Sequence, residues 1–225
     1  MSLVDGLEKL KTGAMLAIIG DVLAIAGVIF AVASVGTGIN PADIQSIFLV
    51  LGVILIPFLI AMILAIIAFI LWFQATGKLK EIKDDLGIGR TGMILQLIGL
   101  LLMIASVVIV FPVFFASSSQ IHSFESEMIW PTIGAMAFGM MALMGLGGLI
   151  IVSGAILFGI MLLRLSKVEG VDQGFNTAGI LYLIGIGASV LFAAVGSILM
   201  FAALVLIYMS ANRSLKNLNS SQSLS

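Results

Sequence analysis

The sequence predicts an all-α membrane protein, a polytopic transmembrane helical bundle of about five spans, with six possible. Of its 225 residues, 61% are hydrophobic and only 9% are charged, whereas a soluble domain of this size carries about 25% charged residues. The apolar residues also fall into runs long enough for helices to cross a hydrocarbon core about 30 Å thick. We therefore expect lipid to cover much of the surface of a single integral membrane domain over residues 1–225.

Five apolar runs have the length that a transmembrane helix requires, which is about 17 to 25 residues with few charges. They cover residues 13–35, 44–73, 93–116, 133–163 and 179–209, followed by a polar Ser- and Asn-rich tail over 210–225. Pro41 and Pro131 precede the second and fourth runs. Proline at the first helical position lacks only a donor that would be unpaired there anyway, so both residues favour a helix start.

The basic residues indicate how the spans are oriented in a cell membrane. With a cytoplasmic N-terminus, five spans place eight of the 10 Lys and Arg residues inside and leave Arg213 and Lys216 outside. Folding the last run into a hairpin would remove this exception. Its 31 residues, however, reach only about 46 Å as helix, and two crossings need roughly 60 Å plus a turn. We therefore expect the C-terminus outside.

Three of the runs begin with similar sequences, which indicates an internal repeat. The similar segments are TGAMLAIIG at 12–20, TGMILQLIG at 91–99 and TAGILYLIG at 177–185. The repeat predicts two helical hairpins and a final single span, each unit starting from the inner face.

Small residues at alternating steps of three and four predict close helix packing. Such a stripe lets another helix approach and gain dispersion contacts, because lipid supplies no hydrophobic drive between helices. The first run has this stripe along its length, and the fourth run has glycines on more than one side. The glycines that we expect at helix contacts are Gly13, Gly20, Gly27, Gly99, Gly145, Gly148 and Gly185.

Asp21 is the one acid or base well inside an apolar run, about nine residues or roughly 13 Å from its inner edge. An unpaired carboxylate there costs a few kcal/mol and by default marks a function. The alternative is a protonated Asp21 that hydrogen-bonds across a helix interface to Gln96, Ser106 or Ser189. Gln96 and Tyr182 occupy equivalent positions in the repeat, so both could line a binding site. Alternatively, Gln96 forms a hydrogen bond between helices, and Tyr182 lies at the level of the lipid headgroups.

The segment 78–90 alternates apolar and charged residues, with leucine and isoleucine on one side. This pattern is typical of a helix that lies on lipid headgroups or extends the second span, and we expect Gly87 and Gly89 to end it. Anionic lipid is the expected partner of its lysines.

Several classes of chemistry are excluded by composition. The chain has no cysteine and one histidine, His122. Thiolate chemistry and paired-histidine or histidine-rich metal sites are therefore absent, and we expect no catalytic, metal or cofactor site. The net charge of −1 argues against nucleic acid as a partner.

Segments 5–13 (DGLEKLKTG), 90–92 (RTG) and 177–185 resemble an archaeal family of polytopic membrane proteins, domain-of-unknown-function family 973. The resemblance covers most of the chain and implies an archaeal cell membrane, but it supplies no activity.

Two functions remain open from the sequence. The first is a non-enzymatic membrane protein that acts by packing, as a homo-oligomer or as an accessory subunit of a membrane complex. The alternative is a transporter or channel for a small solute or ion that uses Asp21.

Overall fold

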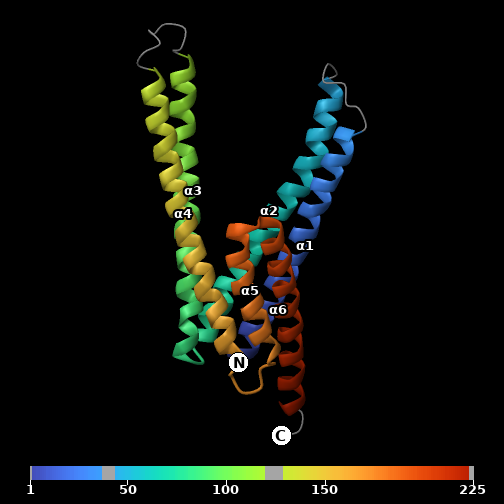
Figure 1. The fold of residues 1–225 in the computed structure, drawn as a ribbon. Helices are drawn as coiled ribbons and strands as arrows, with labels where there is room; N and C mark the ends of the chain where they lie inside the picture. Colours follow the sequence, from blue (N-terminus) through green and yellow to red (C-terminus); the bar gives the residue numbers. More distant parts are fainter. Residues whose placement is uncertain (1, 37–43, 120–128, 223–225) are drawn as a thin grey trace. The chain divides into compact units, whose positions relative to one another are not determined.

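The fold is known from a computed structural model that describes residues 2–36, 44–119 and 129–222. In these residues the chain forms six α-helices and one 3-10 helix, η1 (Figure 1). The helices are α1 (Ser2–Gly36), α2 (Ile44–Lys80), η1 (Asp84–Leu86), α3 (Gly87–Ser119), α4 (Ile129–Leu165), α5 (Gly174–Leu191) and α6 (Ala193–Gln222). The all-α fold class is confirmed, since five helices, all except α5, are long and apolar enough to cross a membrane.

The chain divides into two compact units. The first comprises residues 1–90 and 159–225, and it contains α1, α2, η1, α5 and α6 with the adjoining ends of α3 and α4. The second comprises residues 91–158, the rest of the α3–α4 pair. A single integral domain remains a prediction.

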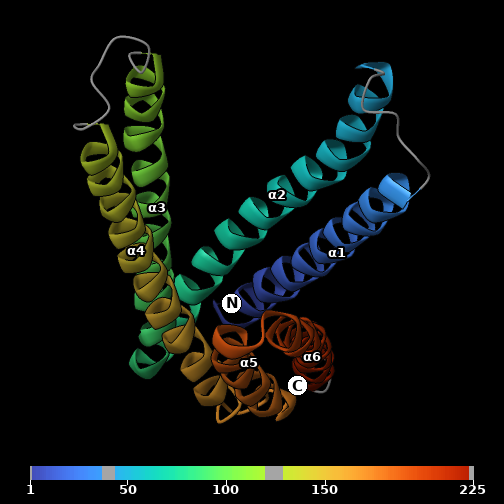
Figure 2. The same ribbon diagram turned by 45° about the horizontal axis from the view of Figure 1, so that its top comes forward.

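The first four apolar runs lie inside α1 to α4, but the helices extend further. Figure 2 shows α1 and α2 side by side as an antiparallel pair. α2 continues through Lys80, so the segment after the second span does extend it. Gly87 caps the short helix η1, but neither Gly87 nor Gly89 ends the extension of α2, which stops at Lys80, and α3 begins at Gly87. The backbone N–H of Gly87 bonds the carbonyl oxygen of Asp84, which carries the chain directly from η1 into α3.

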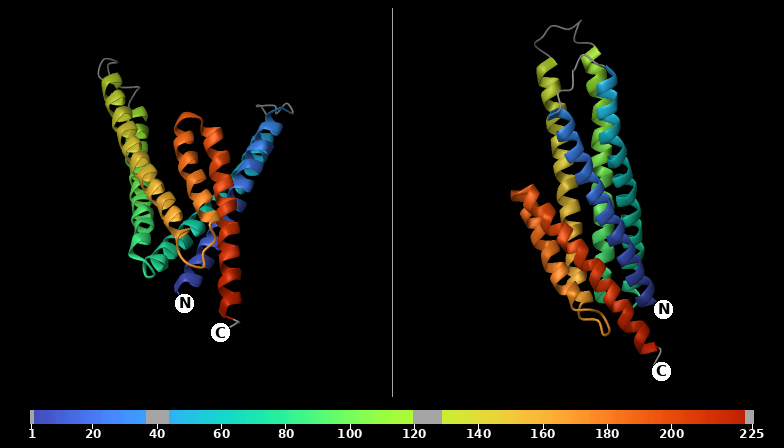
Figure 3. Two further views of the ribbon diagram at one scale, coloured as in Figure 1. Left: turned by 60° about the horizontal axis from the view of Figure 1, so that its bottom comes forward. Right: turned by 90° about the vertical axis from the view of Figure 1, so that its right-hand side faces the viewer.

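The expected fifth span, 179–209, is wrong as a continuous helix. The chain leaves helical geometry at Phe192, with φ −141° and ψ 88°, and α5 and α6 form an antiparallel hairpin around it (Figure 3). The hairpin is longer than the apolar run 179–209, to which the length estimate was applied. α5 begins at Gly174 and α6 continues to Gln222, so the two helices reach about 27 and 45 Å.

Residues of the supposed polar tail are therefore part of α6, where serines pack in the interior. Ser214 is fully buried, and its hydroxyl donates to the carbonyl oxygen of Ser210 at 2.8 Å. The same hydroxyl accepts the backbone N–H of Asp172 at 2.8 Å. The Asp172 carboxylate in turn accepts the N–H of Gly174 at 2.6 Å, at the start of α5. These bonds attach the end of α6 to the start of α5.

Both termini of the first unit lie at one end. The Nζ of Lys11 in α1 donates to Oδ1 of Asn212 in α6 at 3.3 Å, and the ribbon has the N and C labels at the same end of this unit (Figure 1). In the first unit the two ends therefore lie together, unlike the opposite sides that we expected from five spans. Arg213 and Lys216 of α6 lie at the same end of the unit as the basic residues of α1.

Burial in the first unit is concentrated at this basic end. The fully buried side chains there include Leu7, Leu10, Leu79, Phe175 and Ile207. Further along α1 and α2 the apolar side chains face outward, with Val28, Phe30 and Phe58 about 60% exposed (60%, 61% and 61%). Contiguous apolar surface of this extent is typical of a protein in contact with lipid.

Candidate functional site: a cavity beside Asp21

Glycines bring α1 and α2 together. A Cβ built on Gly13 would lie 2.6 Å from Trp72, and one on Gly20 would lie 3.3 Å from the carbonyl oxygen of Ala61. Gly27 is buried as well. Because glycine has no side chain, the α2 backbone lies where a larger residue would clash. Three of the glycines that the stripe singled out thus lie on the inner side of α1.

The position of Gly20 recurs in the other two repeats. Gly20, Gly99 and Gly185 end the three similar segments, and each abuts the helix that follows its own. A Cβ on Gly99 would lie 2.6 Å from the carbonyl oxygen of Gly147 in α4, and one on Gly185 would lie 2.8 Å from Cγ of Met200 in α6. The repeat therefore corresponds to three helical hairpins, and the expected final single span is replaced by α5–α6.

Gly145 and Gly148 do not contribute to these contacts. Within the described part of the chain, a Cβ on either residue would meet no atom within 4 Å. The glycines of α4 that face α3 are Gly147 and Gly154. They lie seven residues apart, which places both on one face of the helix. This spacing distinguishes them from the other glycines of α4.

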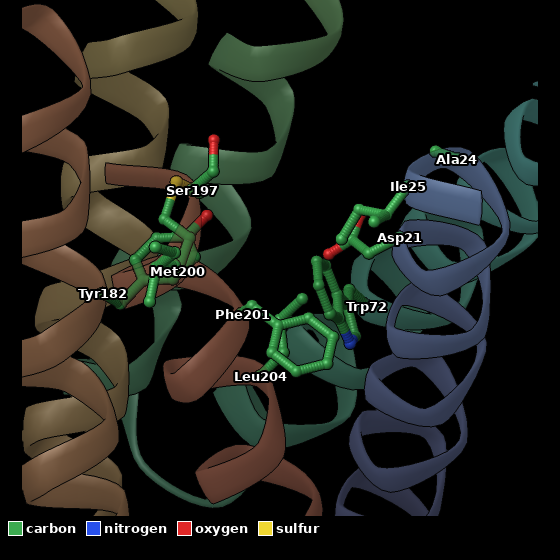
Figure 4. Close-up of a pocket in the computed structure, with 10 residues that line it drawn as sticks. Asp21, Ala24, Ile25, Trp72, Tyr182, Ser197, Met200, Phe201 and Leu204 are labelled. Carbon is green, nitrogen blue, oxygen red and sulfur yellow. The ribbon is translucent and has the colours of Figure 1, made fainter. Parts of the chain in front are cut away.

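A cavity of about 530 Å³ lies in the first unit between α1, α2, α5 and α6. Figure 4 shows Asp21, Ala24 and Ile25 of α1 on one side, and Ser197, Met200, Phe201 and Leu204 of α6 on the other. The lining is completed by Trp72 of α2, Tyr182 of α5 and Ile198 of α6. Its surface is largely apolar and contains three aromatic rings and one carboxylate.

Asp21 projects into this cavity because Gly20 occupies the contact with α2. Adjacent residues of a helix point about 100° apart, so packing Gly20 against Ala61 turns Asp21 away from α2. In Figure 4 its carboxylate extends from α1 toward Phe201 and Trp72. Among the described residues it forms no hydrogen bond or ion pair, and Ser189 instead donates to the carbonyl oxygen of Ile186 at 2.7 Å.

Two of the rings that line the cavity are held by contacts with other helices. Nε1 of Trp72 donates to the carbonyl oxygen of Leu10 at 3.3 Å, across the α1–α2 contact. Tyr182 is 6% exposed and lies beside Gly159, where a Cβ would come within 3.3 Å of its ring. Trp72 and Phe201 were not expected at a site, because an aromatic near the end of an apolar run looks the same as one at the headgroup level.

Gln96 lies in the second unit, on α3. Its side-chain nitrogen is buried and has no hydrogen-bond partner within the described residues. Ser106, the other partner considered for Asp21, donates to the carbonyl oxygen of Met103 on its own helix at 2.7 Å. The site assembled by the first unit therefore contains Asp21 and Tyr182 without Gln96.

The described residues contain no group of three or more His, Asp and Glu side chains that could hold a metal ion. Asp21 is the one acidic or basic residue of the cavity lining. The chemistry that these side chains offer is therefore binding by one carboxylate and three rings.

The chain thus has the features of a polytopic membrane protein. Its long apolar helices are arranged in successive hairpins, and a cavity lies between α1, α2, α5 and α6. The family described as "Protein of unknown function (DUF973)" matches residues 4–225, and the chain belongs to that family. The resemblance noted in the sequence is thus confirmed. No curated protein and no solved structure matches the chain.

Proposed function

We propose that this chain is a non-enzymatic membrane protein that binds small organic cations in the cavity beside Asp21 and carries them through the membrane. One observation carries this proposal: a carboxylate inside a membrane-spanning helix faces a hollow lined by aromatic rings. Of the two functions left open by the sequence, transport thus has the more direct structural support.

The carboxylate favours a positively charged ligand. An isolated carboxylate at this depth costs several kcal/mol unless it is paired, protonated or hydrated. A cation in the cavity would remove that cost. The described neighbours of Asp21 in the lining supply no positive charge.

The rings favour an organic cation over a metal ion. Trp72, Tyr182 and Phe201 line the cavity with Asp21, and aromatic faces attract ammonium groups by about 0.5–2 kcal/mol each. A small metal ion needs several oxygen ligands, whereas this lining has one carboxylate and few other oxygens. A quaternary ammonium or phosphonium ion, with apolar substituents, matches both features.

The basic end of the first unit suggests the direction of access. Lys9, Lys11, Arg213 and Lys216 all lie at that end, and basic residues favour the cytoplasmic side. We infer that both termini are cytoplasmic. The cavity then lies about 15 Å into the membrane, because Asp21 follows Lys11 by ten residues of helix.

Flux measurements test this proposal. Proteoliposomes that contain the full chain should take up radiolabelled tetraphenylphosphonium faster than empty liposomes, and Asp21→Asn should abolish the difference. Glu169→Gln is the matched control, since it removes an exposed carboxylate outside the cavity, and it should leave uptake unchanged. Equal uptake by wild type and Asp21→Asn would contradict the proposal.

A second candidate function is assembly, favoured by the open glycines of α4. Gly134, Gly139, Gly145 and Gly148 have no atom within 4 Å of a Cβ in the described chain. Glycine in a helix that faces only lipid gains nothing from its small size, whereas a helix of a second copy or of another membrane subunit could approach it closely. Cross-linking in native membranes should give a dimer or larger species, and Gly148→Leu should reduce it. A monodisperse monomer with no co-purifying protein would count against this function.

A further inference from the structure

A second hollow, of about 260 Å³, lies at the basic end of the first unit and is separate from the Asp21 cavity. It is formed where α1, α2 and the start of α3 meet. Its lining contains Lys9, Phe73, Gln74, Gly77, Lys78, Glu81 and Arg90. Three cations from three different helices therefore surround one small space that holds a single carboxylate.

The cations of this basic hollow are only weakly neutralised. Lys9 lies 3.8 Å from Asp5, and Lys78 lies 3.6 Å from Glu81. The two carboxylates are 45% and 59% exposed, and ion pairs of this length and exposure contribute little. An anionic group in the hollow could therefore compete for both lysines.

Arg90 is positioned by a ring instead of by a carboxylate. Its Cζ lies 5.9 Å from the centroid of the Phe73 ring, and this cation–π contact orients the guanidinium without cancelling its charge. A guanidinium offers a planar fork of donors that matches two oxygens of a phosphate group.

The location suits a group at the membrane surface. Trp72, the neighbour of Phe73, bonds to the backbone of α1 at Leu10, and the lysines of the hollow stand just beyond the apolar part of α1 and α2. Clusters of basic residues at this level attract anionic headgroups by about 1 kcal/mol for each charge. Gly77 leaves one side open, because a Cβ there would meet no atom within 4 Å.

We propose that Lys9, Lys78 and Arg90 form a binding site for the phosphate group of an anionic lipid headgroup. Arg90 holds two phosphate oxygens through its guanidinium, and the two lysines contact the group from α1 and α2. The lipid chains extend along the exposed apolar side chains of the neighbouring helices. The site makes no use of Asp21 and does not depend on cation transport.

Lipid retention by the purified, delipidated full chain tests this site. Native mass spectrometry after addition of phosphatidylglycerol or phosphatidylcholine should show at least about fivefold greater occupancy by phosphatidylglycerol, a difference of ~1 kcal/mol. Arg90→Gln should remove this preference. Lys83→Gln is the matched control, because it removes one charge from an exposed position of the same segment, and it should keep the preference.

A variant that keeps all charges distinguishes binding in the hollow from nonspecific attraction between basic residues and anionic lipid. Gly77→Met should fill the hollow without a clash at its Cβ, and it should lower phosphatidylglycerol occupancy while circular dichroism and elution volume stay unchanged. Unchanged preference in Arg90→Gln, or equal loss in Lys83→Gln, would overturn the proposal. If millimolar inorganic phosphate released the bound phosphatidylglycerol, the ligand of the site would be free phosphate and not a lipid headgroup, which would overturn the proposal.

Discussion

The Nζ of Lys11 and the Oδ1 of Asn212 lie 3.3 Å apart, although 201 residues separate them in the chain. Their hydrogen bond joins the start of the apolar part of α1 to the last turns of α6. It requires α5 and α6 to reverse direction between them, and it brings the basic residues of both termini to one end of the first unit.

Cysteine labelling tests this arrangement, because the chain has no cysteine of its own. Glu8→Cys, Asp84→Cys and Asn219→Cys place single thiols on exposed residues of α1, η1 and α6. A membrane-impermeant maleimide should reach all three from the same side of sealed vesicles. Labelling of Asn219→Cys from the side opposite Glu8→Cys would restore an odd number of crossings and refute the hairpin.

The contact between Gly99 and Gly147 predicts that one methyl group added at Gly99 will destabilise the fold. A Cβ on Gly99 would lie 2.6 Å from the carbonyl oxygen of Gly147 and 3.0 Å from the backbone nitrogen of Ile151. Backbone atoms cannot move aside as a side chain can, so Gly99→Ala should lower the free energy of unfolding by ~1–3 kcal/mol. Thermal unfolding followed by circular dichroism measures this loss.

Gly187→Ala provides the control for that experiment. Its Cβ would meet no atom within 4 Å in the described chain, and alanine favours a helix by about 1 kcal/mol over glycine. Its melting temperature should stay the same or rise. Equal destabilisation by both substitutions would show that steric contact is not the cause.

Ser214 predicts a polar contribution to stability at the end of α6. Ser214→Ala should leave the backbone N–H of Asp172 without the acceptor that now lies at 2.8 Å, and loss of a buried partner costs ~1–3 kcal/mol. Ser220→Ala removes an exposed hydroxyl that donates to carbonyl oxygens of its own helix at 2.9 and 3.0 Å, and it should have little effect. We expect a lower melting temperature for Ser214→Ala alone.

The helices of the first two hairpins were predictable because long apolar runs require helical backbone in lipid. The third hairpin was not, because Phe192 is an ordinary apolar residue and no proline or glycine occupies the break itself. The small residues before and after Phe192 were the signals that could have located the break. Gly185 and Gly196 let α5 and α6 approach closely, and Ser210 and Ser214 allow the polar end of α6 to pack inside.

The candidate site was predictable only in part. A charge inside an apolar run is visible in any sequence, so Asp21 could be singled out. Its companions Trp72 and Phe201 could not, because they come from other helices, and their side chains resemble those of lipid-facing positions. Gly145 and Gly148 pack against no other described helix of this chain, because spacing locates a face on a helix without identifying the neighbour of that face.

Fluorescence of Trp72 gives the most direct measure of whether the Asp21 cavity binds an organic cation. In a Trp130→Phe background, Trp72 is the one remaining tryptophan, and it lines the cavity. Tetraphenylphosphonium should quench its emission in a saturable way, and Asp21→Asn should weaken the binding by at least about tenfold, or ~1.4 kcal/mol. Quenching that does not saturate, or an affinity that is the same with and without the Asp21 carboxylate, would contradict the account.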